Sequence, residues 1–238
     1  MLPIEVFLLV ASSGALALND KPQDHAHQDV LADSRRGPEP VYTYRCFKEN
    51  IESYPPPKLW LSFSELWNIN RERILTSNGG NTYLQHHIQQ AILKVSTESN
   101  IDARLILGLV MGESRGKASS PCVGGNVSRC GMLHALNGSS LDESESSHSV
   151  ERMVREGISG SPEHGLGYAQ LVQGKPPVAN VTPGCPFSAA RAYHSGAVRE
   201  DANELERDGH DVEDAGFVND FANRLLGWDG RGEGFKEC

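Results

Sequence analysis

One carboxylate in this sequence stands at the end of an almost wholly apolar segment. The stretch LILGLVMGESRG, residues 105–116, carries a run of large apolar side chains directly before Glu113. On a helix, Leu109 and Val110 share the face of Glu113, because residues three and four positions apart lie above one another. Burial disfavours a charged carboxylate and raises its pKa. A carboxyl that stays protonated near neutral pH can act as a general acid, as glycosidases require.

The alternative is that Glu113 simply ends a helix and reaches solvent, as most carboxylates in such a position do. A glycosidase with two catalytic carboxylates needs a second acid near the first. We expect no second acid in a comparably apolar setting, because Asp142, Glu143 and Glu145 lie in a serine-rich, solvated stretch. The residues therefore favour a mechanism with one carboxylate.

The segments that must position Glu113 carry helical patterns. Ser62 and Glu65 have the spacing of a capping box, which predicts a helix running towards residue 74. Asn100 is expected to cap a helix over residues 102–113. Apolar residues also recur at helical spacing in the sets Leu84, Ile88, Ala91, Ile92 and Val95; Val150, Met153, Val154 and Ile158; Phe187–His194; and Phe217, Phe221, Leu225 and Leu226.

Polar stretches separate the predicted helices. We expect an exposed excursion at residues 139–149, glycine-rich turns around residues 164–174, and a solvated acidic loop over residues 200–214. No convincing run of alternating apolar and polar residues predicts a sheet. The fold class predicted from the pattern is therefore mainly α.

The composition is typical of a soluble globular protein. The 238 residues suffice for one domain with its own core. The formal net charge of −9 offers no attraction to nucleic acid or to an anionic membrane, so we expect neither as a partner. We also expect a monomer that needs no cofactor and no metal.

The N-terminal region predicts export. Residues 1–17 combine an apolar run with a small-residue site at 15–17, which together are typical of a signal peptide and too short to span a bilayer. Residues 18–40 are polar and contain proline, so they are expected to be a disordered linker, or a pro-segment cleaved after the dibasic pair that ends at Arg36. The folded domain is then residues 41–238, in a secreted, extracellular protein.

Cysteines and sequons agree with export. In an exported protein, cysteines predict disulfides. Cys122 and Cys130 are separated by a short, glycine-containing loop, so we expect them to pair. The pairing stays open for the remaining three, Cys46, Cys185 and Cys238. Three sequons predict N-glycosylation at Asn126, Asn137 and Asn180.

Five stretches occur in an order that is typical of one enzyme family. They are LILGLVMGES, GMLHALNG, HGLGYAQLVQG, AARAYHSG and ANRLLGW. Together they resemble the soluble lytic transglycosylases and goose-type lysozymes of glycoside hydrolase family 23, and most closely the secreted fungal proteins with this domain. The resemblance covers residues 42–230 and implies a lysozyme-like, mainly α fold with a saccharide groove.

The resemblance also implies roles for single residues. Glu113 would be the catalytic acid/base and Tyr193 would place its hydroxyl near that carboxyl. His134 stands where the family has glutamine and His194 where it has asparagine, and both can still donate and accept hydrogen bonds. The residues implied to bind or frame substrate are Ser114, Met132, His134, Gln170, Tyr193 and His194.

The activity implied is cleavage of β-1,4 bonds between N-acetylated sugars of peptidoglycan. Glu113 would protonate the glycosidic oxygen while the substrate's own N-acetyl group supports the anomeric carbon. The reaction would end either with a 1,6-anhydro sugar as product, as in a lytic transglycosylase, or with hydrolysis of the bond by water, as in a lysozyme. Two alternatives are open: a chitin-cleaving enzyme of the same fold, and a secreted protein that binds N-acetylated glycans without cutting them.

Overall fold

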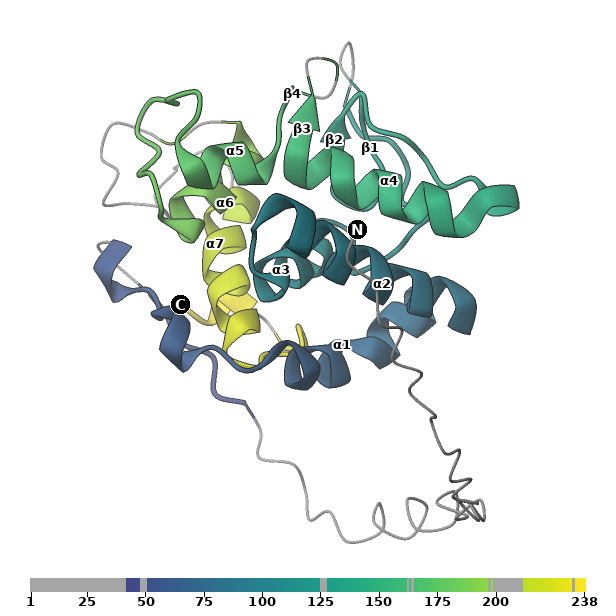
Figure 1. Ribbon diagram of the computed structural model, residues 1–238. Helices are drawn as coiled ribbons and strands as arrows, with labels where there is room; N and C mark the ends of the chain where they lie inside the picture. The colour runs from purple at the N-terminus through teal and green to yellow at the C-terminus, as the bar shows by residue number, and fades with distance from the viewer. Residues whose placement is uncertain are drawn as a thin grey trace, which may run out of the picture. The chain divides into compact units, whose positions relative to one another are not determined.

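The computed structural model describes residues 42–47, 51–124, 128–161, 163, 165–196, 198, 212–232 and 234–238. The chain divides into two units, Met1–Val41 and Tyr42–Cys238. The predicted signal peptide at 1–17 and the predicted linker at 18–40 lie outside the described residues. The second unit holds the folded domain, and its elements are drawn in Figure 1.

This domain is mainly α, as the sequence pattern predicts. Its α-helices are α1 (Phe63–Ser77), α2 (Thr82–Ser99), α3 (Ala103–Glu113), α4 (Ser146–Ser159), α5 (Tyr168–Gln173), α6 (Pro186–Ser195) and α7 (Val212–Leu225). Short 3₁₀ turns are η3 (Ile51–Ser53), η4 (Pro57–Leu59), η5 (Glu143–Glu145) and η6 (Gly234–Glu237). Two small antiparallel hairpins pair β1 (Arg129–Cys130) with β2 (Ala135–Leu136), and β3 (Gly160–Ser161) with β4 (Gly165–Leu166).

Local sequence signals explain where the first helices begin and end. Ser62 accepts a hydrogen bond from the backbone N–H of Glu65, and Glu65 accepts one from the N–H of Ser62, so the predicted capping box is present. The apolar set predicted for the next helix is the buried face of α2. The cap predicted for α3 is wrong by two residues. Asp102 caps α3, whereas Asn100 ends α2 in the left-handed conformation, with φ +56°.

One expected loop contains helix, the glycine-rich turns flank another short helix, and the expected acidic loop is only partly described. Helix α4 begins at residue 146, inside the expected excursion, because Ser149 is fully buried and its hydroxyl donates to the carbonyl of Asp142. Helix α5 lies inside residues 164–174, with Gly167 and Gly174 at its two ends, so the glycine-rich turns expected around this stretch flank a short helix. Of the expected acidic loop, residues 200–211 lie outside the described residues, and α7 begins at Val212.

Helix α3 is the centre of the core. It packs against α1, α2, α6 and α7, and its side chains from Leu105 to Met111 are buried (Figure 1). Two glycines allow α7 to approach closely. A Cβ on Gly108 would lie 2.7 Å from the ring of Phe221, and one on Gly112 would lie 2.8 Å from the ring of Phe217. The C-terminal end of α3 therefore lies in the interior and places Glu113 there.

Two disulfides cross-link the domain, one between its two ends and one within a short loop. Cys46 is joined to Cys238, and Cys122 is joined to Cys130, the pair expected from sequence. Cys185 keeps a buried free thiol.

Within the described ranges, no helix combines the length and apolar character needed to cross a membrane.

Candidate functional site

Glu113 is a buried carboxylate held between two histidines. Only 4% of its side-chain surface is exposed. Its Oε2 lies 3.2 Å from Nδ1 of His134 and its Oε1 lies 3.0 Å from Nδ1 of His194. An ionised carboxylate only accepts hydrogen bonds, so both imidazoles donate to it through Nδ1. Glu113 therefore does not simply end its helix in solvent.

Three separate elements bring this cluster together. Glu113 is the last residue of α3, His134 lies in the turn between β1 and β2, and His194 lies in the last turn of α6. His134 has φ +47°, an uncommon backbone conformation for a residue other than glycine. The ring of His194 stacks on Phe217 of α7, with ring centroids 3.9 Å apart and planes 4° apart. Both rings are thus oriented by the fold.

The ionisation of Glu113 differs from the sequence expectation. Burial alone raises the pKa of its carboxyl. The hydrogen bonds from His134 and His194, together with their positive charge, lower that pKa by more, so the pKa lies below its ordinary value. The expectation that the Glu113 pKa is raised is therefore wrong. It was based on the apolar helix alone, whereas two imidazoles face the end of that helix and lower the pKa.

Tyr193 holds the turn between β1 and β2 that carries His134. Its hydroxyl donates to the carbonyl of Leu133, the residue before His134, at 2.7 Å. Burial, and then the charge of Glu113, raise the pKa of the Tyr193 hydroxyl well above its ordinary value. Tyr193 thus stays protonated and fixes the turn.

Three residues expected to bind or frame substrate have other partners. Ser114 donates to the carbonyl of Val110 at 3.2 Å and caps α3. Met132 is fully buried in the core. Gln170 accepts from the backbone N–H of Gly167 at 2.8 Å and so closes the start of α5. In this arrangement their polar groups serve the fold, and Met132 offers no surface to a ligand.

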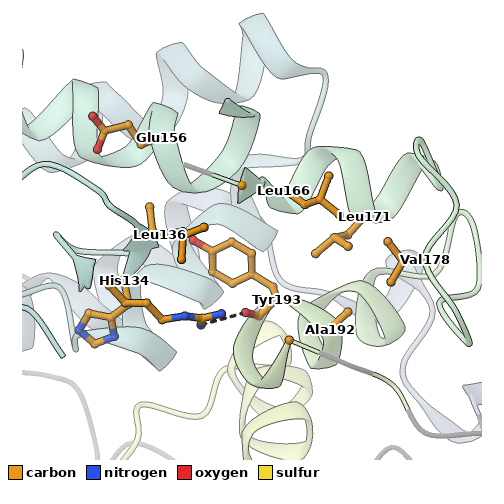
Figure 2. A pocket seen from close by; sticks show the side chains of 12 residues that line it. His134, Leu136, Glu156, Leu166, Leu171, Val178, Ala192 and Tyr193 are labelled. Carbon is orange, nitrogen blue, oxygen red and sulfur yellow. Dashed lines mark hydrogen bonds between the residues drawn. The ribbon is translucent and has the colours of Figure 1, made fainter. Parts of the chain in front are cut away.

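A pocket of about 230 Å³ opens beside the β1–β2 turn that carries His134. His134 lies at one end of it and Val178 at the other, with Leu136 and Tyr193 between them (Figure 2). Its walls are largely apolar, and its polar side chains include Arg129 and Glu156. The full lining is Arg129, His134, Ala135, Leu136, Glu156, Gly165, Leu166, Leu171, Val178, Ala192, Tyr193 and Gly196.

Sequence reasoning missed Glu156. This carboxylate is buried in α4 and lines the pocket, so the expectation that no second acid has a comparably apolar setting is wrong. It accepts from the backbone N–H of Ser139 at 2.7 Å and from the Ser139 hydroxyl at 2.6 Å. Its position three residues after Met153, on a strongly amphipathic helix, is the signal that was available.

Sequence reasoning also missed Ser120. Its hydroxyl oxygen lies 3.1 Å from Nε2 of His134, the ring nitrogen that does not face Glu113. Ser120 is partly exposed and follows the irregular turn that leaves α3. No local motif marks it, because its approach to His134 depends on how that turn and the β1–β2 turn fold together.

The remaining predicted sites are dispersed. Asn126 lies outside the described residues, Asn137 is exposed, and the side-chain amide of Asn180 donates to the carbonyl of Val198 at 2.9 Å. Across the described part of the chain, no group of three histidine, cysteine or carboxylate side chains is placed to hold a metal ion.

Comparisons with known proteins gave no match. No protein-family model, no curated protein and no solved structure matches this chain. The resemblance to glycoside hydrolase family 23 therefore stays a prediction from the motifs quoted above.

Proposed function

We propose that this protein is a secreted glycosidase that cleaves β-1,4 bonds between N-acetylated sugars of peptidoglycan. The fold that the proposal implies is lysozyme-like, with the pocket beside His134 as part of a saccharide groove. The observation that supports it is the convergence of three motif residues. Glu113, His134 and His194 come from three stretches far apart in the chain and meet on one buried carboxylate.

Glu113 is the acid/base of the proposed reaction. Because the pKa of Glu113 is lowered, its carboxylate is ionised at neutral pH, and the proton for the reaction comes from the fraction of molecules in which this carboxyl is protonated, a fraction that grows as the pH falls. Delivery of that proton to the glycosidic oxygen frees the leaving sugar, while the substrate's N-acetyl group supports the anomeric carbon. Glu113 then takes a proton from a sugar hydroxyl, giving a 1,6-anhydro product, or from water.

The decisive experiment exchanges the carboxylate for an amide. Glu113→Gln keeps the shape of the side chain but cannot transfer the proton. We expect it to abolish the clearing of purified bacterial walls while circular dichroism and glycan binding stay unchanged. Glu72→Gln, the same exchange at an exposed position of α1, is the control and should retain wild-type activity. Wall clearing by folded Glu113→Gln would refute the proposal.

A second candidate is a secreted protein that binds N-acetylated glycans without cutting them. Two observations favour it: Glu113 is held as a carboxylate by both histidines, and the net charge of −9 opposes attraction to anionic walls. The same assay with chitin oligomers and peptidoglycan fragments separates the cases. Binding without any product from wild type supports the binding protein, and products from chitin alone support the chitin-cleaving alternative.

A further inference from the structure

Ser120 extends the cluster into a linear chain of three groups. Its hydroxyl oxygen is 3.1 Å from Nε2 of His134, and Nδ1 of the same ring is 3.2 Å from Oε2 of Glu113. A hydroxyl, an imidazole and a buried carboxylate in this order are the parts of an activated serine nucleophile. The five motifs of the glycosidase resemblance do not include Ser120.

The hydrogen-bonding roles in this chain follow from the carboxylate. Glu113 is ionised and can only accept, so the Nδ1 of His134 carries the hydrogen that points to it. In the neutral ring the other nitrogen, Nε2, then has a free lone pair. Nε2 is therefore the acceptor for the Ser120 hydroxyl, which is the tautomer that a general base requires.

We propose that Ser120, His134 and Glu113 form an acyl-transfer site that hydrolyses carboxylic esters, an activity beyond the glycosidase function. The Ser120 oxygen attacks the ester carbonyl as its proton passes to Nε2 of His134. The ester C–O bond breaks, and that proton leaves with the alcohol. Water then attacks the acyl-serine, gives a proton to His134 and releases the carboxylic acid, and the proton returns to Ser120.

The pocket beside His134 indicates which acyl group the site takes. The pocket is lined mainly by apolar side chains, among them Leu136, Leu171 and Val178. The guanidinium of Arg129 also lines it, held by the carbonyls of Tyr193 and His194 at 3.4 and 3.3 Å. Its fixed positive charge gives the largely apolar pocket a cationic group that can attract the carbonyl oxygen of an ester. The class of substrate is thus an ester with a short apolar acyl chain.

The test uses the full-length protein with p-nitrophenyl butyrate and with a fluorophosphonate probe. We expect ester hydrolysis by wild type, at least a 100-fold loss of kcat/KM in Ser120→Ala, and a change of less than twofold in Ser119→Ala. Ser119 is the adjacent, exposed serine and so provides a matched control. Peptide mapping of the labelled wild type should place the phosphonate on Ser120, a result that does not depend on how well a variant folds.

The outcome separates this site from the proposed glycosidase. Ser119→Ala should retain both activities, whereas Glu113→Gln should lose both. Absence of ester hydrolysis and labelling in wild type, or a label on any residue other than Ser120, would overturn the acyl-transfer proposal and leave the wall-clearing result unaffected. Ester hydrolysis without wall clearing would instead support this site and reject the glycosidase.

Discussion

The two histidines around Glu113 make a prediction about pH. Exchanging them for the amides of the resembled family, His134→Gln with His194→Asn, keeps hydrogen-bond donors and removes the positive charge that lowers the pKa of Glu113. Burial then raises this pKa, so a larger fraction of the carboxyl is protonated at a given pH. The alkaline limb of the wall-clearing pH profile should therefore move to higher pH.

Two controls accompany this profile. His148→Asn, at an exposed position of α4, should leave the limb where it is in wild type. His194→Asn alone should retain ester hydrolysis, because the relay from Ser120 runs through His134. A limb that stays in place or moves to lower pH in the double variant would contradict the electrostatic account of the cluster.

Glu156 decides whether the proposed glycosidase uses one carboxylate or two. Both of its oxygens accept hydrogen bonds from Ser139, which points to a structural role. Glu156→Gln leaves one donor of Ser139 unmatched, so we expect a loss of about 1–3 kcal/mol of stability and wall clearing within a few-fold of wild type. Thermal unfolding and clearing rates measure the two effects.

Variants at the other acids serve as references for Glu156. Asp142→Asn and Glu145→Gln should change wall clearing little, because both side chains are exposed and lie outside the pocket lining. A folded Glu156→Gln protein with no clearing would show that the single-carboxylate mechanism is wrong.

The site could be predicted from sequence only in part. Glu113, His134 and His194 were found through motifs, because each lies at a fixed place relative to a helix end or a glycine turn. The same motifs gave Met132 and Gln170 roles that the packing does not support: one is core and the other caps α5. The lowered pKa of Glu113 depends on contacts 21 and 81 residues away in sequence, which helical periodicity cannot indicate.

Helix α3 controls the site through the glycines that face α7. An alanine at 112 would place its Cβ 2.8 Å from the ring of Phe217, and that ring stacks on His194. We expect Gly112→Ala to lose about 1–3 kcal/mol through overpacking, partly offset by roughly 1 kcal/mol of helix propensity. It should also slow wall clearing, because His194 moves relative to Glu113.

Gly108→Ala is the matched control one turn earlier. Its Cβ would lie 2.7 Å from the ring of Phe221, which stacks on Phe217 at a centroid distance of 6.5 Å, one step further from the His194 ring, so stability should fall by a similar amount while clearing per folded molecule falls less than in Gly112→Ala. Equal loss of activity in both variants would mean that the helix contact matters only for stability.

The elements themselves were more predictable than the site. The capping box at Ser62 and the apolar face of α2 depend on residues within one or two turns, and both were placed correctly. The cap of α3 was misplaced because Asn100 and Asp102 are both good cap residues, and the choice between them depends on where α2 ends. Helix α5 was missed because its six residues lie between glycines.

The ends of the domain meet along α7. Asn219 accepts from the backbone N–H of Phe47 at 2.8 Å and donates to its carbonyl at 3.1 Å. Asn223 does the same for Arg45, at 2.9 and 2.8 Å. These two asparagines give an extended segment the partners that a neighbouring strand would supply. The neighbouring disulfide, Cys46–Cys238, ties the same segment to the residue that follows η6, 192 positions later in the sequence.

This long loop predicts unequal effects of the two disulfides on stability. Closing a chain restricts the unfolded state more as the loop lengthens, by about 5 kcal/mol for a loop of this size and about 2–3 kcal/mol for the short Cys122–Cys130 loop. Chemical denaturation should therefore show a larger loss of unfolding free energy in Cys46→Ser than in Cys122→Ser. Asn219→Ala, which keeps both disulfides but leaves Phe47 without its partner, should cost about 1–3 kcal/mol. If Cys46→Ser costs no more than Asn219→Ala, the segment from Arg45 to Phe47 is held mainly by its hydrogen bonds to α7, and chain closure contributes little.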